Sequence, residues 1–231
     1  MDHRSLVLVL SAVLLALSSF VFGWKFVKKR NYLLGIEMWV VGVSSSNAVV
    51  FFATESPVSY AISHFFDAFS RGLGMPVIAV LGMMTITHGF KPSTRFDVAA
   101  FVVSFAVTFF VLEAHFFEGI LPYFFLAMSV LLSLYLAYVI KRLLGIGAVL
   151  QAIAVLLALA SCQAIAAIYD FYKIPGEETN VVFNFYTLAL CTWAYLMPSL
   201  HYAYSALERA QKRDVQVHSD HALHGLGRTS R

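Results

Sequence analysis

The sequence predicts an all-α integral membrane protein, a bundle of seven transmembrane helices with its N-terminus outside and its C-terminus in the cytoplasm. Three observations predict this fold. Of the 231 residues, 60% are hydrophobic and only 13% are charged, too few charges to cover the surface of a soluble domain of this size. The charges fall in short clusters between apolar runs of about 20 residues, the length of a helix that crosses a bilayer. Basic clusters also alternate with acidic ones along the chain.

Seven apolar runs are visible, with short connections between them. They cover residues 6–24, 33–53, 68–88, 98–112, 120–140, 144–169 and 181–204. Helices are expected because backbone polar groups inside a bilayer must be satisfied within the segment. A membrane barrel would show alternating segments of about 10 residues each, and these are absent here. We therefore expect one transmembrane domain over 1–207, followed by a disordered polar tail over 208–231.

The first run is followed, not preceded, by basic residues. Lys25, Lys28, Lys29 and Arg30 lie directly after it, whereas a cleaved signal peptide carries its charge before the apolar stretch. A positive flank at this end is retained in the cytoplasm. The first run is therefore a membrane span with its N-terminus outside.

The later connections repeat this pattern. Segments 25–31, 91–97, 141–142 and 208–231 would lie inside and hold 13 of the 16 Lys and Arg residues. The remaining three are Arg4, Arg71 and Lys173, while most acidic residues lie outside or at the outer boundary. An excess of Lys and Arg in cytoplasmic segments is typical of proteins of the plasma membrane or the bacterial inner membrane.

Two runs have unusual compositions. The third extends from Val58 to His88, about 46 Å as one helix and longer than the bilayer core. Because Gly72, Gly74 and Pro76 favour a bend or a break, we expect a separate interfacial helix over 57–67 and a span from residue 68 to 88. The sixth run is rich in alanine, and small residues that allow close helix approach predict that it lies at the bundle centre.

Polar residues within the runs predict a ligand pocket. Ser44–Asn47 cover all faces of the second helix, so some of them must face protein or a water-filled cavity. Glu37 lies on the same run, with a salt bridge to the preceding basic loop as its alternative role. Hydrogen bonds between helices are the alternative for the other polar residues. The predicted ligand-binding residues are Glu37, Ser45, Asn47, Asp67, Arg71, Gln163 and Trp193.

A second group of ionisable residues lies near the outer ends of the runs. His64, Asp67 and Arg71 share one helical face if the turn is helical. His64, Glu113 and His115 could bind a transition metal, because imidazole and carboxylate groups are its usual ligands. No HExxH spacing is present. The alternative is an Asp67–Arg71 ion pair with the other groups hydrated at the membrane surface.

These observations favour a non-catalytic function. The leading hypothesis is a small sensor or transporter that binds a small ligand, an ion or a proton in a polar pocket of the bundle. One alternative is a metal- or haem-dependent membrane enzyme that uses the outer histidine and carboxylate cluster. Another is an accessory subunit of a larger membrane complex. The sequence identifies no particular cofactor. The expected partners are the lipid bilayer, the ligand and a membrane or cytoplasmic protein, but not nucleic acid.

Overall fold

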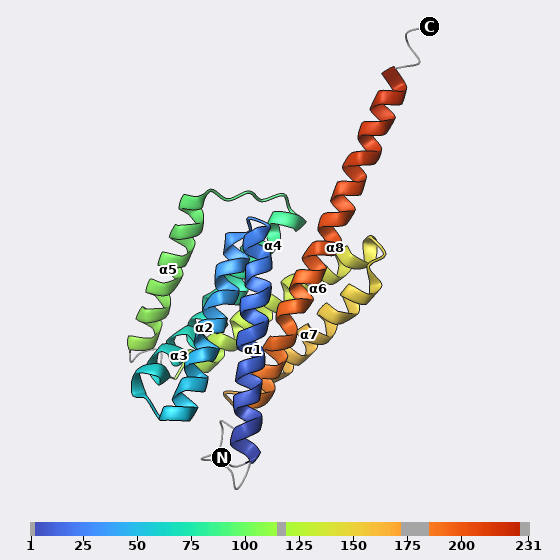
Figure 1. The fold of residues 1–231 in the computed structure, drawn as a ribbon. Coiled ribbons are helices and arrows are strands. Elements are labelled where there is room, and N and C mark those ends of the chain that lie inside the picture. The colour runs from blue at the N-terminus through green and yellow to red at the C-terminus, as the bar shows by residue number, and fades with distance from the viewer. Residues whose placement is uncertain (1–2, 115–118, 172–184, 227–231) are drawn as a thin grey trace.

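The computed structural model describes residues 3–114, 119–171 and 185–226. Within these ranges the chain is helical and contains no strand. The elements are α1 (His3–Lys28), α2 (Tyr32–Thr54), α3 (Pro57–Phe69), the π-helical segment η1 (Ser70–Ala79), α4 (Val80–Thr87), α5 (Thr94–Glu113), α6 (Leu121–Gly145), α7 (Val149–Ile168) and α8 (Thr187–Leu226). Since α3, η1 and α4 are continuous, the described chain forms seven helical rods (Figure 1).

Six rods are long and apolar enough to cross a membrane by length and composition. They are α1 from Leu6, α2, the continuous rod Pro57–Thr87, α5, α6 and α7. This agrees with the predicted all-α membrane class. The rod α8 contains most of the seventh predicted run, 181–204, whose first residues lie outside the described ranges. It is not one of the six, and polar residues such as Ser199 and His201 interrupt its apolar part.

Three of the rods begin at residues whose side chains cap the helix. The side chain of Asn31 accepts a hydrogen bond from the Leu34 N–H at the start of α2, at 3.2 Å. Ser56 caps α3 in the same way, with Pro57 in its first turn, and Ser93 caps α5. These are the residue types that satisfy the free N–H groups of a first helical turn.

The predicted run 144–169 begins too early. Residues 146–148 form the turn between α6 and α7, where Gly147 has a φ of 74°. Glycine adopts this left-handed conformation without steric penalty. As a result Lys141 and Arg142 lie in the last turns of α6 and not in a loop.

The predicted break in the third run is also wrong. The rod stays helical from Pro57 to Thr87 and changes to π-helical geometry over Ser70–Ala79. Pro76 has no N–H to donate, so a regular α-helix would lose a hydrogen bond there; the π-helical segment is where the chain accommodates this residue. Residues 57–67 are therefore the first turns of the same rod, not a separate helix.

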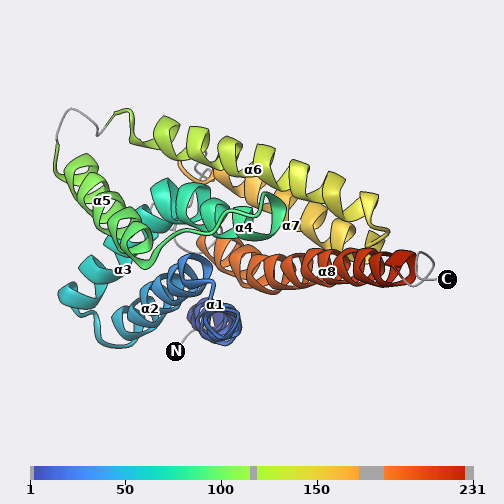
Figure 2. The same ribbon diagram turned by 90° about the horizontal axis from the view of Figure 1, so that it is seen from above.

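The third rod occupies the middle of the bundle (Figure 2). It packs against α2 on one side and α6 on the other, while α5 lies at the edge. In its most apolar stretch 61% of the residues are buried, against 17% in α7. The prediction that the alanine-rich sixth run is central is therefore wrong, because larger side chains of the third rod and of α8 fill the interior.

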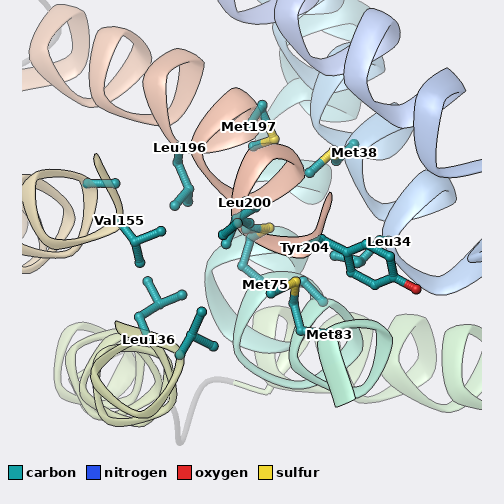
Figure 3. Close-up of a cluster of buried hydrophobic side chains, with 14 of the residues drawn as sticks. Leu34, Met38, Met75, Met83, Leu136, Val155, Leu196, Met197, Leu200 and Tyr204 are labelled. Carbon is teal, nitrogen blue, oxygen red and sulfur yellow. The ribbon is translucent and has the colours of Figure 1, made fainter. Parts of the chain in front are cut away.

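The part of the main core drawn in Figure 3 joins six elements. The labelled side chains are Leu34 and Met38 of α2, Met75 of η1, Met83 of α4, Leu136 of α6, Val155 of α7, and Leu196, Met197, Leu200 and Tyr204 of α8. Four of these are methionines, whose unbranched side chains fill irregular spaces and repack easily. The core beside the π-helical segment is thus built of adaptable side chains.

The helices α1 and α2 approach each other through two glycines. A Cβ added to Gly35 would lie 2.6 Å from Val27 Cγ2 and 3.1 Å from the Gly23 carbonyl oxygen. A Cβ added to Gly23 would lie 2.9 Å from the Gly35 carbonyl oxygen. Small residues allow two membrane helices to approach each other this closely.

Polar contacts hold α4 and α8 at the end of the bundle opposite the N-terminus. Arg142 donates to the Thr87 carbonyl at 3.0 Å, and Gln211 donates to the Ile86 carbonyl at 2.8 Å. The last carbonyls of α4 thereby receive donors from α6 and α8. Beyond Gln211, α8 continues as a helix to Leu226 and projects past the other rods (Figure 1), where we expected a disordered tail.

The glycine contact gives a first prediction. We expect Gly35→Ala to lower the stability of the bundle by roughly 1–3 kcal/mol, because the new methyl group overpacks the α1–α2 contact. Gly145→Ala is the matched control, since a Cβ there meets nothing within 4 Å. Thermal unfolding in detergent, followed by circular dichroism, measures both. Equal midpoints for the two variants would show that the glycine contact does not limit helix approach.

A second prediction concerns Glu208, which pairs with Lys29 and, at 3.2 Å, with Lys212. Partial burial alone would raise the pKa of Glu208, but hydrogen bonds and ion pairs with both lysines lower it below its ordinary value. The resulting stability is fully present above the ordinary glutamate pKa, about 4.3. It is lost as the pH falls through the lowered pKa of the folded protein.

We therefore expect Glu208→Gln to destabilise the protein by less than about 1 kcal/mol near neutral pH. The difference from wild type should vanish in acid, where both proteins carry an uncharged side chain. Thermal midpoints of the two proteins over a pH series test this. A difference that is independent of pH would refute the role of the ion pairs.

Candidate functional site

A cavity of about 90 Å³ lies between the third rod and helices α2, α6, α7 and α8. This volume admits several water molecules or a small ligand. Its polar lining includes Ser44, Ser45, Asp67, Ser70, Arg71, Ser129, Tyr169, Tyr186 and Trp193. Apolar side chains form the rest of the wall, among them Phe66, Phe125, Met75 and Leu196.

The cavity extends from one end of the bundle to mid-depth. Tyr169 and Tyr186 flank the end of α7 and the start of α8, whereas Leu196 lies nine residues into α8, or about 14 Å along its axis. This is about half of a bilayer core of about 30 Å. Tyr169 and Tyr186 lie toward the end of the bundle that the sequence predicts to be outside.

Arg71 of η1 is held by groups from three elements. It forms an ion pair with Asp170, which follows α7, and a longer one with Asp67 Oδ2 of α3 at 3.7 Å. Its guanidinium carbon lies 4.3 Å from the ring centroid of Phe125 and 4.9 Å from that of Tyr169. The Asp67–Arg71 ion pair, which the sequence offered as the alternative to a metal site, is thus present, and the structure adds Asp170, which sequence spacing did not reveal.

This cluster has an unequal charge balance. Two carboxylates, Asp67 and Asp170, face one guanidinium, so the cluster carries one net negative charge when all three are ionised. The Asp67 side chain is 41% exposed, whereas that of Asp170 is 19% exposed. Asp67 is therefore the carboxylate that a molecule in the cavity can reach.

The polar stretch Ser44–Asn47 divides into two parts. Ser44 donates to the Ser63 carbonyl at 3.0 Å and Ser45 to the Ala12 carbonyl at 2.6 Å, and both line the cavity. Ser46 and Asn47 instead donate to carbonyls one turn back on α2. Of this stretch, the structure places Ser45 in the wall of the cavity and Asn47 outside it.

Trp193 and Gln163 also differ in position. Trp193 lines the cavity from α8. The Gln163 side-chain oxygen accepts hydrogen bonds from Ser129 at 3.2 Å and Ser133 at 2.8 Å. Gln163 therefore joins α7 to α6 and positions the wall without lining it.

Glu37 is buried just beyond the inner end of the cavity. It lies one turn from Val41, which lines the cavity, and the Ser70 side chain is its polar neighbour across the interface with η1. Neither carboxyl oxygen has a hydrogen-bond partner among the described residues. The alternative role as a salt bridge to the basic loop is not seen, because Lys29 pairs with Glu208 instead.

The predicted metal residues do not assemble in the part of the chain that the structure describes. His64 and Glu113 are exposed, the first on α3 and the second at the end of α5. The described residues include no group of three His, Cys, Asp or Glu side chains that could hold a metal ion. His115 lies outside the described residues, so the complete set stays a prediction.

The candidate site is thus a cavity that reaches from one end of the bundle to mid-depth, with an accessible carboxylate near aromatic rings and a second, buried carboxyl close to its inner end. No family model matches this chain, and no curated protein or solved structure matches it either.

Proposed function

We propose that this chain is a seven-span protein of the plasma membrane or the bacterial inner membrane that binds a small organic cation in its cavity. In this proposal it works as a sensor or a transporter. The observation that carries the proposal is the accessible carboxylate of Asp67, which faces a cavity with excess negative charge and aromatic walls.

The arrangement of the rods supports seven crossings. The connections after α1, α4 and α6 and the C-terminal part of α8 lie toward the upper end in Figure 1, and the N-terminus lies at the other end. These upper segments are the ones rich in Lys and Arg, as expected for cytoplasmic segments. Residues 187–207 of α8 span about 31 Å as a helix, enough for a seventh crossing.

The chemistry of the cavity favours a cation over an anion. Arg71 already has two carboxylate partners, so a ligand carboxylate would have to displace one of them. An ammonium group would instead pair with Asp67 and lie near the rings of Phe66, Tyr186 and Trp193. Aromatic faces attract ammonium groups, and more strongly where water is excluded.

Two uses of such a site are each supported by one feature. The π-helical segment lines the cavity, and irregular helices at mid-depth are common where transporters bind their substrates. The helix α8 lines the same cavity and continues past the bundle, which suits a sensor that passes a change at the cavity to a cytoplasmic partner.

Cysteine labelling tests the proposed topology. We would replace Cys162 and Cys191 by alanine and introduce single cysteines as Gly119→Cys, Lys91→Cys and Arg209→Cys. A membrane-impermeant maleimide should label Gly119→Cys in intact cells, and the other two only after permeabilisation. Labelling of Arg209→Cys in intact cells would show that α8 does not cross.

Fluorescence tests ligand binding. The chain has three tryptophans, so Trp24→Phe with Trp39→Phe leaves Trp193 as the only indole. Titration with choline, tetramethylammonium and a primary alkylamine should change its emission. The uncharged isostere of choline, dimethylbutanol, should bind at least about tenfold more weakly.

Asp67→Asn should reduce cation affinity by about tenfold or more, because it removes the accessible carboxylate. Glu113→Gln is the matched control, since Glu113 is exposed at the end of α5 and does not line the cavity. The proposal fails if none of the three cations gives a saturable change in Trp193 fluorescence. It also fails if Asp67→Asn binds them as tightly as wild type.

A further inference from the structure

Glu37 is a fully buried carboxyl group that has no ion-pair partner among the described residues and only the Ser70 hydroxyl as a polar side-chain neighbour. Its exposed fraction is 0%, and neither oxygen accepts or donates a hydrogen bond. Its carboxyl packs directly on the backbone of η1: a Cβ added to Gly74 would lie 2.6 Å from Glu37 Oε2. Helix η1 therefore presents a glycine where any larger residue would collide with this carboxyl.

This environment admits only the uncharged form of Glu37. An ionised carboxylate that is removed from water without a cation or hydrogen-bond donors is strongly disfavoured, and at membrane depth no bulk water compensates. A carboxyl with its proton bound avoids this penalty.

Among the described residues, no charged group stabilises an ionised Glu37. The elements packed on α2 are α1, α3, η1 and α4. Their described titratable side chains are Lys25 and Lys28 of α1, Tyr60, His64 and Asp67 of α3, and Arg71 of η1; α8 shares the core cluster with α2 and has His201, Tyr204 and Glu208 among its titratable side chains. None forms an ion pair with Glu37, and the Ser70 hydroxyl is the one side chain that acts on its carboxyl.

The cavity provides a route between Glu37 and water. Val41, one turn along α2 from Glu37, and Ser70 of η1, its polar neighbour, both line the cavity. Ser70 belongs to the π-helical segment η1, which also contains Pro76. π-helical geometry is common at functional sites.

We propose that Glu37 is a proton-binding site of the transmembrane domain, loaded and unloaded through the cavity. On release, the O–H bond of the carboxylic acid breaks and the proton passes to a water molecule in the cavity. The carboxylate left behind requires water, so η1 must move away from α2 around Ser70 and Gly74. The proposal goes beyond binding of an organic cation and does not depend on it.

A proton fits this site better than a metal ion does. Hard cations such as Ca²⁺ and Mg²⁺ take about six or more oxygen ligands. Around Glu37 the described side chains supply one carboxyl and one hydroxyl, that of Ser70. A single carboxyl with few neighbours is sufficient for a proton.

Carbodiimide labelling of the purified full chain tests the proposal. Dicyclohexylcarbodiimide is apolar and reacts with protonated carboxyl groups, so it reports the buried acid directly. We expect mass spectrometry to find the label on Glu37 near neutral pH and not on the exposed Glu113. Labelling should fall about tenfold for each pH unit above the midpoint of ionisation.

Variants separate this role from folding and from ligand binding. Glu37→Gln, which resembles the protonated acid in shape, should fold with an unchanged thermal midpoint and lose the label. Glu37→Asp should keep a label, and Asp67→Asn should leave labelling of Glu37 unchanged. Cation binding without Glu37 labelling would overturn this inference alone, and the reverse would overturn only the proposed function.

Two further outcomes would overturn the proton assignment. Wild-type protein that stays unlabelled at Glu37 across the acidic and neutral range would show that the carboxyl is ionised there. Protection of Glu37 by sodium chloride, but not by choline chloride at equal concentration and pH, would identify a sodium site instead.

Discussion

The contact between Arg71 and Asp170 fixes the third rod within the bundle. A guanidinium at this depth must be paired, because an unpaired charge inside a membrane protein is strongly unfavourable. Its partners are Asp67 on its own rod and Asp170 beyond α7, and the rings of Phe125 and Tyr169 complete its surroundings. The pair thereby sets where α6 and α7 lie against η1, and the cavity is the space left between these elements.

The third rod also shows why this bundle needs glycines in its centre. Gly74 faces the Glu37 carboxyl, and a Cβ on Gly82 would lie 2.7 Å from Leu34 Cγ. Both contacts are with α2. The third rod and α2 therefore approach each other closely from the cavity toward the opposite end of the bundle. The Asn31 side chain, which donates to the Gly82 carbonyl at 2.8 Å, fixes this approach at the start of α2.

Much of the fold could be predicted from the sequence, because hydropathy is a local property. Each apolar run corresponds to a helical rod, and the ion pair of Asp67 with Arg71 follows from helical spacing. Asp170 could not be predicted, since it comes from a segment 99 residues further along the chain. Spacing also gave no way to distinguish Ser45, which lines the cavity, from Asn47, which bonds to its own helix. The central position of the third rod depends on how side chains from several helices pack together. The sequence of one segment does not show this packing.

The close pairing of α1 and α2 has a consequence for how the chain enters the bilayer. Of the six apolar rods, α1 is the most apolar and α2 the least, and α2 carries Glu37 together with the polar stretch Ser44–Asn47. During synthesis α1 emerges first, and it offers α2 a glycine-lined surface and the Ala12 carbonyl that binds Ser45. Polar groups of α2 can then be covered by protein as they leave the insertion machinery, not by lipid. The order of the helices in the chain thus supports co-translational insertion of the segment that carries the buried carboxyl.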